Sequence, residues 1–455
     1  MKGPKVVVIG AGSLFFGRQA LWQMLHSDVL KTGTLAYVDT DPERQQKMMG
    51  LAELMVKHLD SPLTIEGSID RRDVLPGADF VVLSFARDGV KYRGVDCEIS
   101  AKYGVRMCSG DTIGPGGIFR AMRELPVILK VVQDIRELCP DTWLINYINP
   151  TAVNGIGLMR HAPDLKTFAL CDGHHMPHLI DNYLVTGGVV AEKGDVTDEM
   201  RAKVDLRIGG VNHFTWVLGI SYDGRDLLPA VRAKQQKDAA GETADGHSKS
   251  IFNVGMGLDL WDLYGVMPDC MGHTKEYVPY WQGHNVAEDK YPPLATFDAP
   301  KRQERHDAMW AQIDQWLSGE LKPQTFVDEF GPDHATDIIE SMWGNLGKRF
   351  FINQPNKGAV GNFDDDAFFE LLSDVDMDGP RPLPVGDFPR GVRAITQQVL
   401  ETHELTVEAI VNCDRAVLRR AMALDPIVNT IVDADKIIED LLDAEREALP
   451  PGWFE

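Results

Sequence analysis

The first 170 residues alternate between short apolar runs and longer stretches whose apolar residues recur at helical spacing. The run from Val6 to Ile9 is continuous and β-branched, as a strand buried on both faces requires. We predict further strands at residues 34–39, 78–86, 142–150 and 168–170, and helices at residues 18–27 and 117–139. This alternation favours the α/β class, with a doubly wound parallel sheet in the N-terminal part of the chain.

The pattern changes after residue 205. Residues 206–227 alternate like a strand pair that includes a Tyr-Asp-Gly-Arg turn. Long helical patterns follow at residues 302–321, 392–412, 416–424 and 433–449. We therefore expect two domains: the sheet domain over residues 1–170, and a mixed α+β domain over residues 171–455 for substrate binding, metal binding and oligomer contacts.

Composition narrows the classes of function. The chain has 455 residues, of which 46 are basic and 68 acidic, and a formal net charge of −22. This charge argues against nucleic acid or an anionic membrane as a partner. The chain has no signal sequence and no apolar run of roughly 20 residues, so we expect a cytoplasmic protein. Its six scattered cysteines lack paired spacing and are expected to be reduced, as ligands, nucleophiles or small buried residues.

A glycine-rich turn follows the first predicted strand. It reads Gly10-Ala11-Gly12-Ser13-Leu14, and backbone N–H groups in such a turn bind pyrophosphate at a helix N-terminus. Asp39 ends the second strand, where a carboxylate holds the ribose hydroxyls, and no arginine directly follows it to accept a 2′-phosphate. The turn therefore predicts a Rossmann-like NAD site, although an ordinary strand-to-helix turn would show the same glycines.

Polar residues gather where the later strands of the parallel sheet end. Asn149 follows one strand, and Cys171, Asp172 and His174 follow the next, in the sequence Cys-Asp-Gly-His-His-Met-Pro. The carboxyl ends of parallel strands are where such sheets bind ligands. We therefore expect these side chains to lie beside the cofactor.

A metal is one interpretation of this gathering. A structural zinc site needs four ligands, and the sequence has no second cluster of ligand residues to complete a site with Cys171. A catalytic metal needs about three protein ligands, and Asn212-His213 is a polar pair inside an apolar alternation that could supply one. A single histidine in a strand is more often a buried core residue, so the residues alone leave both interpretations open.

Seven stretches together resemble family 4 of the glycoside hydrolases, and they occur in the order found in that family. They are GAGS, DTIGPGGIFRAMRELPV, INYINPTA, CDGHHMP, GVNHFTW, DLYGVMPDCMGHTKEYVPYW and ELTVEAIVNCDRAVLRRAMALDPIV. The family contains NAD- and manganese-dependent α-glucosidases, α-galactosidases, α-glucuronidases and 6-phospho-glucosidases, and it departs from the two-carboxylate mechanism of most glycosidases.

The resemblance implies a role for individual residues. Cys171 and His213 match the metal ligands, Tyr264 the base that removes the C2 proton, and Asp172 the acid for the leaving group. Asn149, Asp111 and Arg87 fall where the family places sugar contacts, and we also expect His174 and Asn212 to contact the sugar. The expected cofactor contacts are Gly10, Gly12, Ser13, Leu14, Asp39 and Arg87.

The resemblance also implies the reaction. NAD+ removes hydride from C3 of the sugar, the ketone acidifies the C2 proton, and the aglycone leaves by elimination. Water then adds and NADH returns the hydride, so no net oxidation occurs. The implied cofactors are NAD and a divalent metal, Mn2+ by resemblance, because a thiol and an imidazole alone would suit zinc better. The implied substrate is a small-molecule α-hexoside, and the implied assembly a homodimer or homotetramer.

Two departures from the family pattern concern the sugar. Cys171-Asp172-Gly173-His174 matches none of the usual four-residue signatures, and Asp111 replaces a glutamate. An anionic sugar is one explanation, as in the related NAD-dependent sulfoquinovosidases. Candidate groups for a sulfonate or carboxylate are His174, His175, Lys91 and Arg93.

Two other classes of protein share part of the pattern. Lactate and malate dehydrogenases have the same N-terminal architecture but use a His-Asp pair without metal, which Cys171, His213 and Tyr264 do not fit. An NAD-sensing regulatory protein is the third hypothesis. Clustered titratable groups at strand ends fit catalysis better than sensing.

Overall fold

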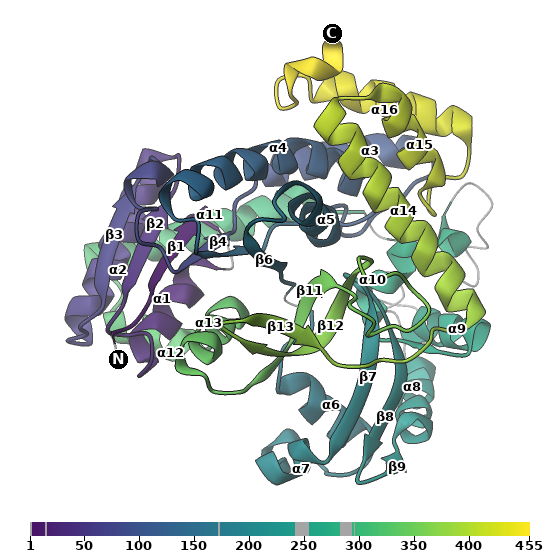
Figure 1. The fold of residues 1–455 in the computed structure, drawn as a ribbon, viewed down its shortest axis with the longest axis horizontal. Coiled ribbons are helices and arrows are strands. Elements are labelled where there is room, and N and C mark those ends of the chain that lie inside the picture. Colours follow the sequence, from purple (N-terminus) through teal and green to yellow (C-terminus); the bar gives the residue numbers. More distant parts are fainter. Residues whose placement is uncertain (1, 14–15, 172, 242–253, 283–293, 295) are drawn as a thin grey trace.

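The computed structural model describes residues 2–13, 16–171, 173–241, 254–282, 294 and 296–455. Within these residues one mixed sheet runs through the molecule, and helices cover both of its faces (Figure 1). The predicted α/β class is confirmed.

The N-terminal half of the sheet is parallel. Its strand order is β3-β2-β1-β4-β5-β6, which is the doubly wound arrangement that the sequence predicts. The strands are β1 (Lys5–Ile9), β2 (Thr34–Val38), β3 (Thr64–Ser68), β4 (Phe80–Leu83), β5 (Trp143–Asn146) and β6 (Lys166–Ala169). The helices between them are α1 (Gly17–His26), α2 (Pro42–His58), α3 (Gly89–Lys102), α4 (Gly114–Leu138) and α5 (Thr151–His161).

The second half of the sheet is antiparallel. Its strands are β7 (Val204–Val211), β8 (Phe214–Tyr222), β9 (Arg225–Asp226), β10 (Met267–Pro268), β11 (Arg349–Pro355), β12 (Phe368–Asp376) and β13 (Gly379–Pro382). Strand β11 joins the two halves, because Asn353 pairs with Ala169 at the end of β6. The sheet is therefore continuous across residue 170, where the sequence predicted a domain boundary.

The second half contains the helices α6 (His178–Thr186), α7 (Asp198–Ala202), α8 (Leu228–Gly241), α9 (Val254–Tyr264), α10 (Met271–Thr274), α11 (Ala299–Ser318), α12 (Pro323–Glu329), α13 (His334–Gly344), α14 (Arg390–Asn412), α15 (Arg415–Leu424) and α16 (Ile431–Ala444). Of these, α11 to α16 pack against helices of the first half. Helix α14 lies against α4 and α5, and α16 lies against α3 (Figure 1). The four long helices predicted for this half correspond to α11, α14, α15 and α16.

The core follows from the alternation along β1. Val7 and Ile9 face a core that includes α4, α5 and the three C-terminal helices, while Val6 and Val8 face a second core that includes α1, α2, α11 and α13. Successive side chains of a strand point to opposite faces, so a continuous apolar run is needed where both faces are covered. No helix in the described part of the chain is long and apolar enough to cross a membrane.

Candidate active site

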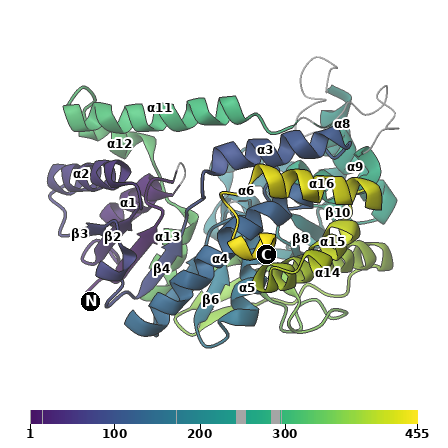
Figure 2. The same ribbon diagram turned by 90° about the horizontal axis from the view of Figure 1, so that it is seen from above.

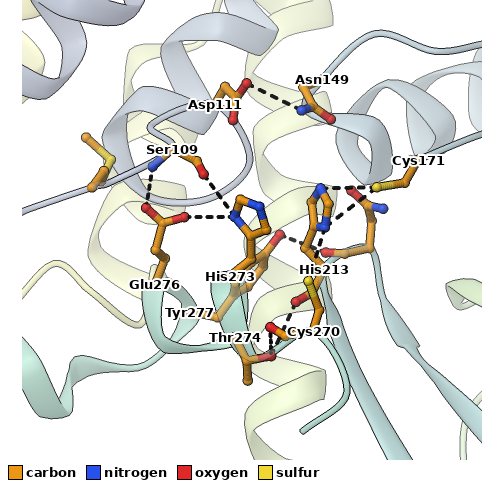
Figure 3. A network of polar contacts seen from close by, with 12 residues as sticks. Ser109, Asp111, Asn149, Cys171, His213, Cys270, His273, Thr274, Glu276 and Tyr277 are labelled. Atoms are coloured by element: carbon orange, nitrogen blue, oxygen red, sulfur yellow. Dashed lines mark hydrogen bonds and ion pairs between the residues drawn. The ribbon is translucent and has the colours of Figure 1, made fainter. Parts of the chain in front are cut away.

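Four of the predicted site residues, Asp111, Asn149, Cys171 and His213, come together where the parallel strands end and the β7–β8 turn meets them. Asn149 follows β5, Cys171 follows β6, and His213 lies in the turn between β7 and β8. Figure 3 shows Asp111 and Asn149 on one side of the His213 and His273 rings, with Cys171 beside His213. Two segments predicted as separate domains therefore contribute to one site.

The glycine turn after β1 is held by β2. Gly10 has a φ of 94°, and a Cβ at this position would lie 2.7 Å from the backbone of Phe85, so glycine is required here. The backbone N–H of Gly12 donates to Asp39 Oδ2 at 2.9 Å, and the N–H of Ser13 donates to the carbonyl of Gly10 at 3.0 Å. Asp39 thus lies beside the turn, where the ribose of a dinucleotide would bind. Leu14 lies outside the described residues.

Arg87 follows β4 and is tied to the C-terminal segment. Its Nη1 donates to the carbonyl of Ala448 at 2.9 Å, and its backbone N–H donates to Glu124 Oε1 at 3.1 Å. These contacts fix the loop after β4 against α4 and against the segment that follows α16. The predicted roles of Arg87 in sugar and cofactor binding remain predictions.

Asp111 is buried among cationic and amide groups. Its Oδ2 accepts from Arg93 at 3.0 Å, from Arg120 at 2.9 Å and from the amide of Asn149 at 3.4 Å. Burial alone would raise the pKa of Asp111, but the two guanidinium groups outweigh it and hold the pKa below its usual value. Asp111 is therefore an anion in a fixed orientation, next to the other predicted sugar contact, Asn149.

Cys171 and His213 lie side by side although 42 positions separate them. Cys171 Sγ is 3.1 Å from His213 Nε2, and both residues are buried. The backbone of His213 is left-handed, with a φ of 61°, which a non-glycine residue adopts at a cost and which occurs often at functional sites. Burial lowers the pKa of His213 to about 3, so its ring is neutral at pH 7 and can offer a lone pair.

Three further residues surround His213 that the sequence analysis did not single out. Cys270 Sγ is 3.6 Å from His213 Nδ1, and the ring of His273 lies 4.3 Å from that of His213. Glu276 Oε2 accepts from His273 Nδ1 at 3.3 Å and raises its pKa against the effect of burial. We call Cys171, His213, Cys270 and His273 the thiol–imidazole cluster. The signal was present in the stretch DCMGHTKEY, which carries a thiol, an imidazole and a carboxylate at helical spacing.

Within the thiol–imidazole cluster, Cys171 and His213 have the spacing of two ligands of one metal ion. Metal–sulfur and metal–nitrogen bonds of about 2.3 and 2.1 Å place two ligands roughly 3.1 Å apart when the angle between them is about 90°. Cys171 Sγ and His213 Nε2 have this separation, 3.1 Å. Within the described part of the chain, no group of three His, Cys, Asp or Glu side chains is arranged to hold an ion. Two protein ligands leave room for substrate oxygens, as a catalytic metal requires.

His174 belongs to a second, fully paired cluster. Its Nδ1 is 2.6 Å from Glu370 Oε1, and its Nε2 contacts Asp269, which also accepts from the hydroxyl of Tyr183. Burial opposes the charge of His174, but the two carboxylates outweigh it and hold its pKa well above the usual value. We call His174, Glu370, Asp269 and Tyr183 the carboxylate–His174 cluster. Both ring nitrogens of His174 are engaged, so neither is offered to a sugar in this arrangement.

Asn212 and Glu370 connect the two clusters. Glu370 Oε2 accepts from the Asn212 side chain and from the backbone N–H of His213, both at 3.3 Å. The hydroxyl of Tyr277 donates to the carbonyl of Asn212 at 2.8 Å. These bonds hold the β7–β8 turn, and with it the His213 ring. The predicted sugar contact of Asn212 remains a prediction.

Tyr264 ends α9 and packs edge-on against Trp216 of β8, with ring centroids 5.2 Å apart. Its hydroxyl contacts the hydroxyl of Tyr280, and burial raises its pKa. A tyrosine with a raised pKa needs a neighbouring cation before it can act as a base. Asp172, the predicted acid, lies outside the described residues.

Comparison with known proteins finds two matching family models and several similar relatives. The model of family 4 glycosyl hydrolases matches residues 5–181, and that of the family's C-terminal domain matches residues 208–428. The chain is 28% identical to an α-galactosidase of Bacillus subtilis, covering 98% of this chain and 99% of the relative. It is 29% identical to a protein of the same organism named "Probable 6-phospho-beta-glucosidase", with coverage of 99% and 98%.

A solved structure shares the fold. A 6-phospho-α-glucosidase from gut microorganisms, crystallised with NAD and Mn2+, superposes with a TM-score of 0.81 at 21% identity and covers 99% of both chains. Both family models match in order and together span most of the sequence. The chain therefore belongs to family 4 of the glycosyl hydrolases and is a glycosidase.

Proposed function

We propose that this glycosidase uses NAD+ and a divalent metal to cleave an α-hexoside. The observation that carries the proposal is the buried pair of Cys171 and His213, with 3.1 Å between Sγ and Nε2, beside the strand ends that follow the glycine turn. A relative of the same fold was crystallised with NAD and Mn2+, which supports both cofactors. Mn2+ is taken from the relatives, since a thiol and an imidazole alone do not select it.

Each residue of the site has a task in this proposal. When bound, NAD+ accepts and returns the C3 hydride, and the metal stabilises negative charge on the sugar oxygens. Cys171 and His213 hold the metal, while Asp111 and Asn149 orient the sugar hydroxyls. Tyr264 takes the C2 proton, and its hydroxyl must leave Tyr280 to do so. Asp172 protonates the leaving oxygen.

We further propose that the sugar carries a negative charge. Arg93 and Arg120 share a single oxygen of Asp111, and Arg120 also lies near the carboxylate of Glu124. The charge of Arg93 is therefore only partly balanced by Asp111. A carboxylate, phosphate or sulfonate would balance the extra charge. Of the four cations suggested by the sequence, His174 is paired with two carboxylates, Lys91 lies over the ring of Tyr92, and His175 packs against the rings of His178 and His334. We favour Arg93 as the contact, because it lies on Asp111, a predicted sugar contact.

The test is hydrolysis of nitrophenyl α-glycosides with NAD+ and Mn2+, with and without EDTA. The panel holds α-glucoside, α-galactoside, α-glucuronide, 6-phospho-α-glucoside and α-sulfoquinovoside. We expect metal-dependent release of nitrophenol without net NADH, and the fastest turnover with an anionic sugar.

Three results would contradict these proposals. Stoichiometric NADH without cleavage would instead support a 2-hydroxy-acid dehydrogenase of the lactate or malate type. Cleavage that survives both EDTA and removal of NAD+ would exclude the redox route. Faster turnover of the neutral glycosides would leave the route intact and refute the negatively charged sugar.

A further inference from the structure

Helix α11 comes from the second half of the chain but crosses the dinucleotide-binding half. It packs against both α2 and α3, the helices that follow β2 and β4 (Figure 2). The crevice of a doubly wound sheet opens at the carboxyl ends of the strands where the strand order reverses, which here is between β1 and β4. Helix α11 therefore covers the adenosine side of that crevice.

The two ends of α11 are fixed by close approach to glycines. A Cβ on Gly94 of α3 would lie 2.9 Å from the Cβ of Ala299, and a Cβ on Gly50 of α2 would lie 3.1 Å from Leu317. Both glycines allow the helices to pack at short range. The helix is thus held rigidly over the crevice at its first and last turns.

The middle of α11 faces the glycine turn that follows β1. His306 and Trp310 are four positions apart and share one side of the helix. The ring of His306 lies close enough to the backbone of Gly12 to interact with it electrostatically. A Cβ on Gly12 would lie 3.0 Å from Trp310 Cζ2 and 2.9 Å from Asp39 Oδ2. Trp310 therefore lies beside the carboxylate that the ribose hydroxyls would meet.

Trp310 also has an unused donor. Its Nε1 is buried and has no hydrogen-bond partner within the described part of the chain. A buried N–H without an acceptor costs about 1–3 kcal/mol, so an acceptor supplied by a ligand would remove that cost. The guanidinium of Arg44 lies 5.8 Å from the Trp310 ring centroid, which gives this wall an aromatic ring and a cation together.

We infer that Trp310 and His306 of α11 form part of the dinucleotide site and bind its adenosine-phosphate half. This inference rests on the proposed use of NAD+. The Trp310 ring packs on the adenosine and its Nε1 donates to a ribose or phosphate oxygen, while His306 holds the glycine turn from above. The adenosine site is therefore completed by a helix that lies about 300 residues after the glycine turn.

Binding measurements on the full chain test the inference. Trp310→Leu removes the ring and the donor, whereas Trp310→Phe keeps a ring and removes only the donor. Trp343→Phe is the control, because Trp343 Nε1 donates to the carbonyl of Lys2 at 3.1 Å, away from the crevice. Calorimetric titrations use NAD+ and ADP-ribose, and Mn2+ binding is followed by electron paramagnetic resonance.

We expect Trp310→Leu to weaken NAD+ and ADP-ribose by about tenfold or more, since stacking of one base on an aromatic ring contributes 1–3 kcal/mol. Trp310→Phe should weaken both by a smaller factor, and Trp343→Phe should change neither. Mn2+ affinity should stay within twofold in all variants.

Changes below twofold in both Trp310 variants would overturn the inference, as would a wild-type chain that binds NAD+ but not ADP-ribose. If Trp310→Leu does not fold, Trp310→Phe alone decides. A wild-type chain that binds no NAD+ refutes the proposed function itself, which separates the two failures.

Discussion

Two buried histidines, His174 and His213, lie in neighbouring clusters and have opposite electrostatic states. Carboxylates engage both ring nitrogens of His174, and its pKa is well above the usual value. His213 contacts thiols, and its pKa is lowered to about 3. The same side chain is thus a fixed cation in one cluster and a neutral ring with an available lone pair in the other.

The difference indicates that His174 has a structural role and that His213 is available for chemistry. A buried cation with two carboxylate partners has no capacity left for a ligand, but its removal leaves two buried negative charges. A neutral imidazole beside a thiol is the form in which both groups bind a metal. Glu370 belongs to the carboxylate–His174 cluster and also accepts from the backbone N–H of His213. The carboxylate–His174 cluster therefore positions the thiol–imidazole cluster.

The largest effect should follow loss of a metal ligand. We expect Cys171→Ser and His213→Ala each to lower turnover by about 10³-fold or more, because Lewis-acid stabilisation amounts to several kcal/mol. NAD+ affinity should stay within a few-fold. Cys413→Ser, at the end of α14, is the control. Full activity and unchanged Mn2+ binding in Cys171→Ser would remove Cys171 from the metal site.

His174→Gln should mainly affect stability. It leaves Glu370 and Asp269 buried without their cation, so we expect the free energy of unfolding to fall by about 3–5 kcal/mol. Urea unfolding of the metal-free chain measures this. The control is His403→Gln, since burial alone lowers the pKa of that histidine. A stable His174→Gln chain that binds the sugar poorly would show instead that His174 contacts the substrate.

Tyr264→Phe should affect one chemical step. If Tyr264 removes the C2 proton, the variant should lose solvent exchange of that proton and about 10²-fold or more in turnover, the usual contribution of a general base. Mn2+ binding and stability should change little. Exchange is followed in D2O by proton NMR, and exchange at the wild-type rate would exclude Tyr264 as the base.

The smallest effect is on pH dependence. The pKa of His174 is raised in the folded chain, so its stabilisation is complete below about pH 6.5 and is lost as the pH rises through the folded pKa. The difference in unfolding free energy between wild type and His174→Gln should therefore shrink at alkaline pH, by at most about 1.4 kcal/mol per pH unit. Urea titrations from pH 6 to 10 test this, and a constant difference would mean that His174 is not the titrating group.

The sequence predicted the parts of the fold that depend on local pattern. Continuous apolar runs located β1, β4 and β5, and helical spacing located the four long helices of the second half. Strand β3 was missed because its residues, Thr64–Ser68, are half-buried or exposed at the edge of the sheet, and they lack an apolar run.

The candidate site was predicted only in part, because many of its contacts join residues that are far apart in the sequence. Residues at strand ends, such as Asn149 and Cys171, follow from topology. Contacts such as Ser109 Oγ to His273 Nδ1, at 2.9 Å, join residues 164 positions apart and need the folded chain. Glu370 did leave a signal in the sequence, since a carboxylate within the apolar run Phe-Phe-Glu-Leu-Leu needs a buried partner.

The junction between the halves of the sheet would give the proposed metal a second role. Strands β6 and β11 are joined through the pairing of Ala169 with Asn353, two residues before Cys171. His213 lies on the other side of that junction, so an ion bound by both residues, as proposed, would link the two halves of the sheet. A ligand at 100 times its dissociation constant adds about 2.7 kcal/mol to the stability of the state that binds it. The ion that prepares the sugar for cleavage would thereby also hold the enzyme together, and its loss would loosen the sheet at the point where catalysis occurs.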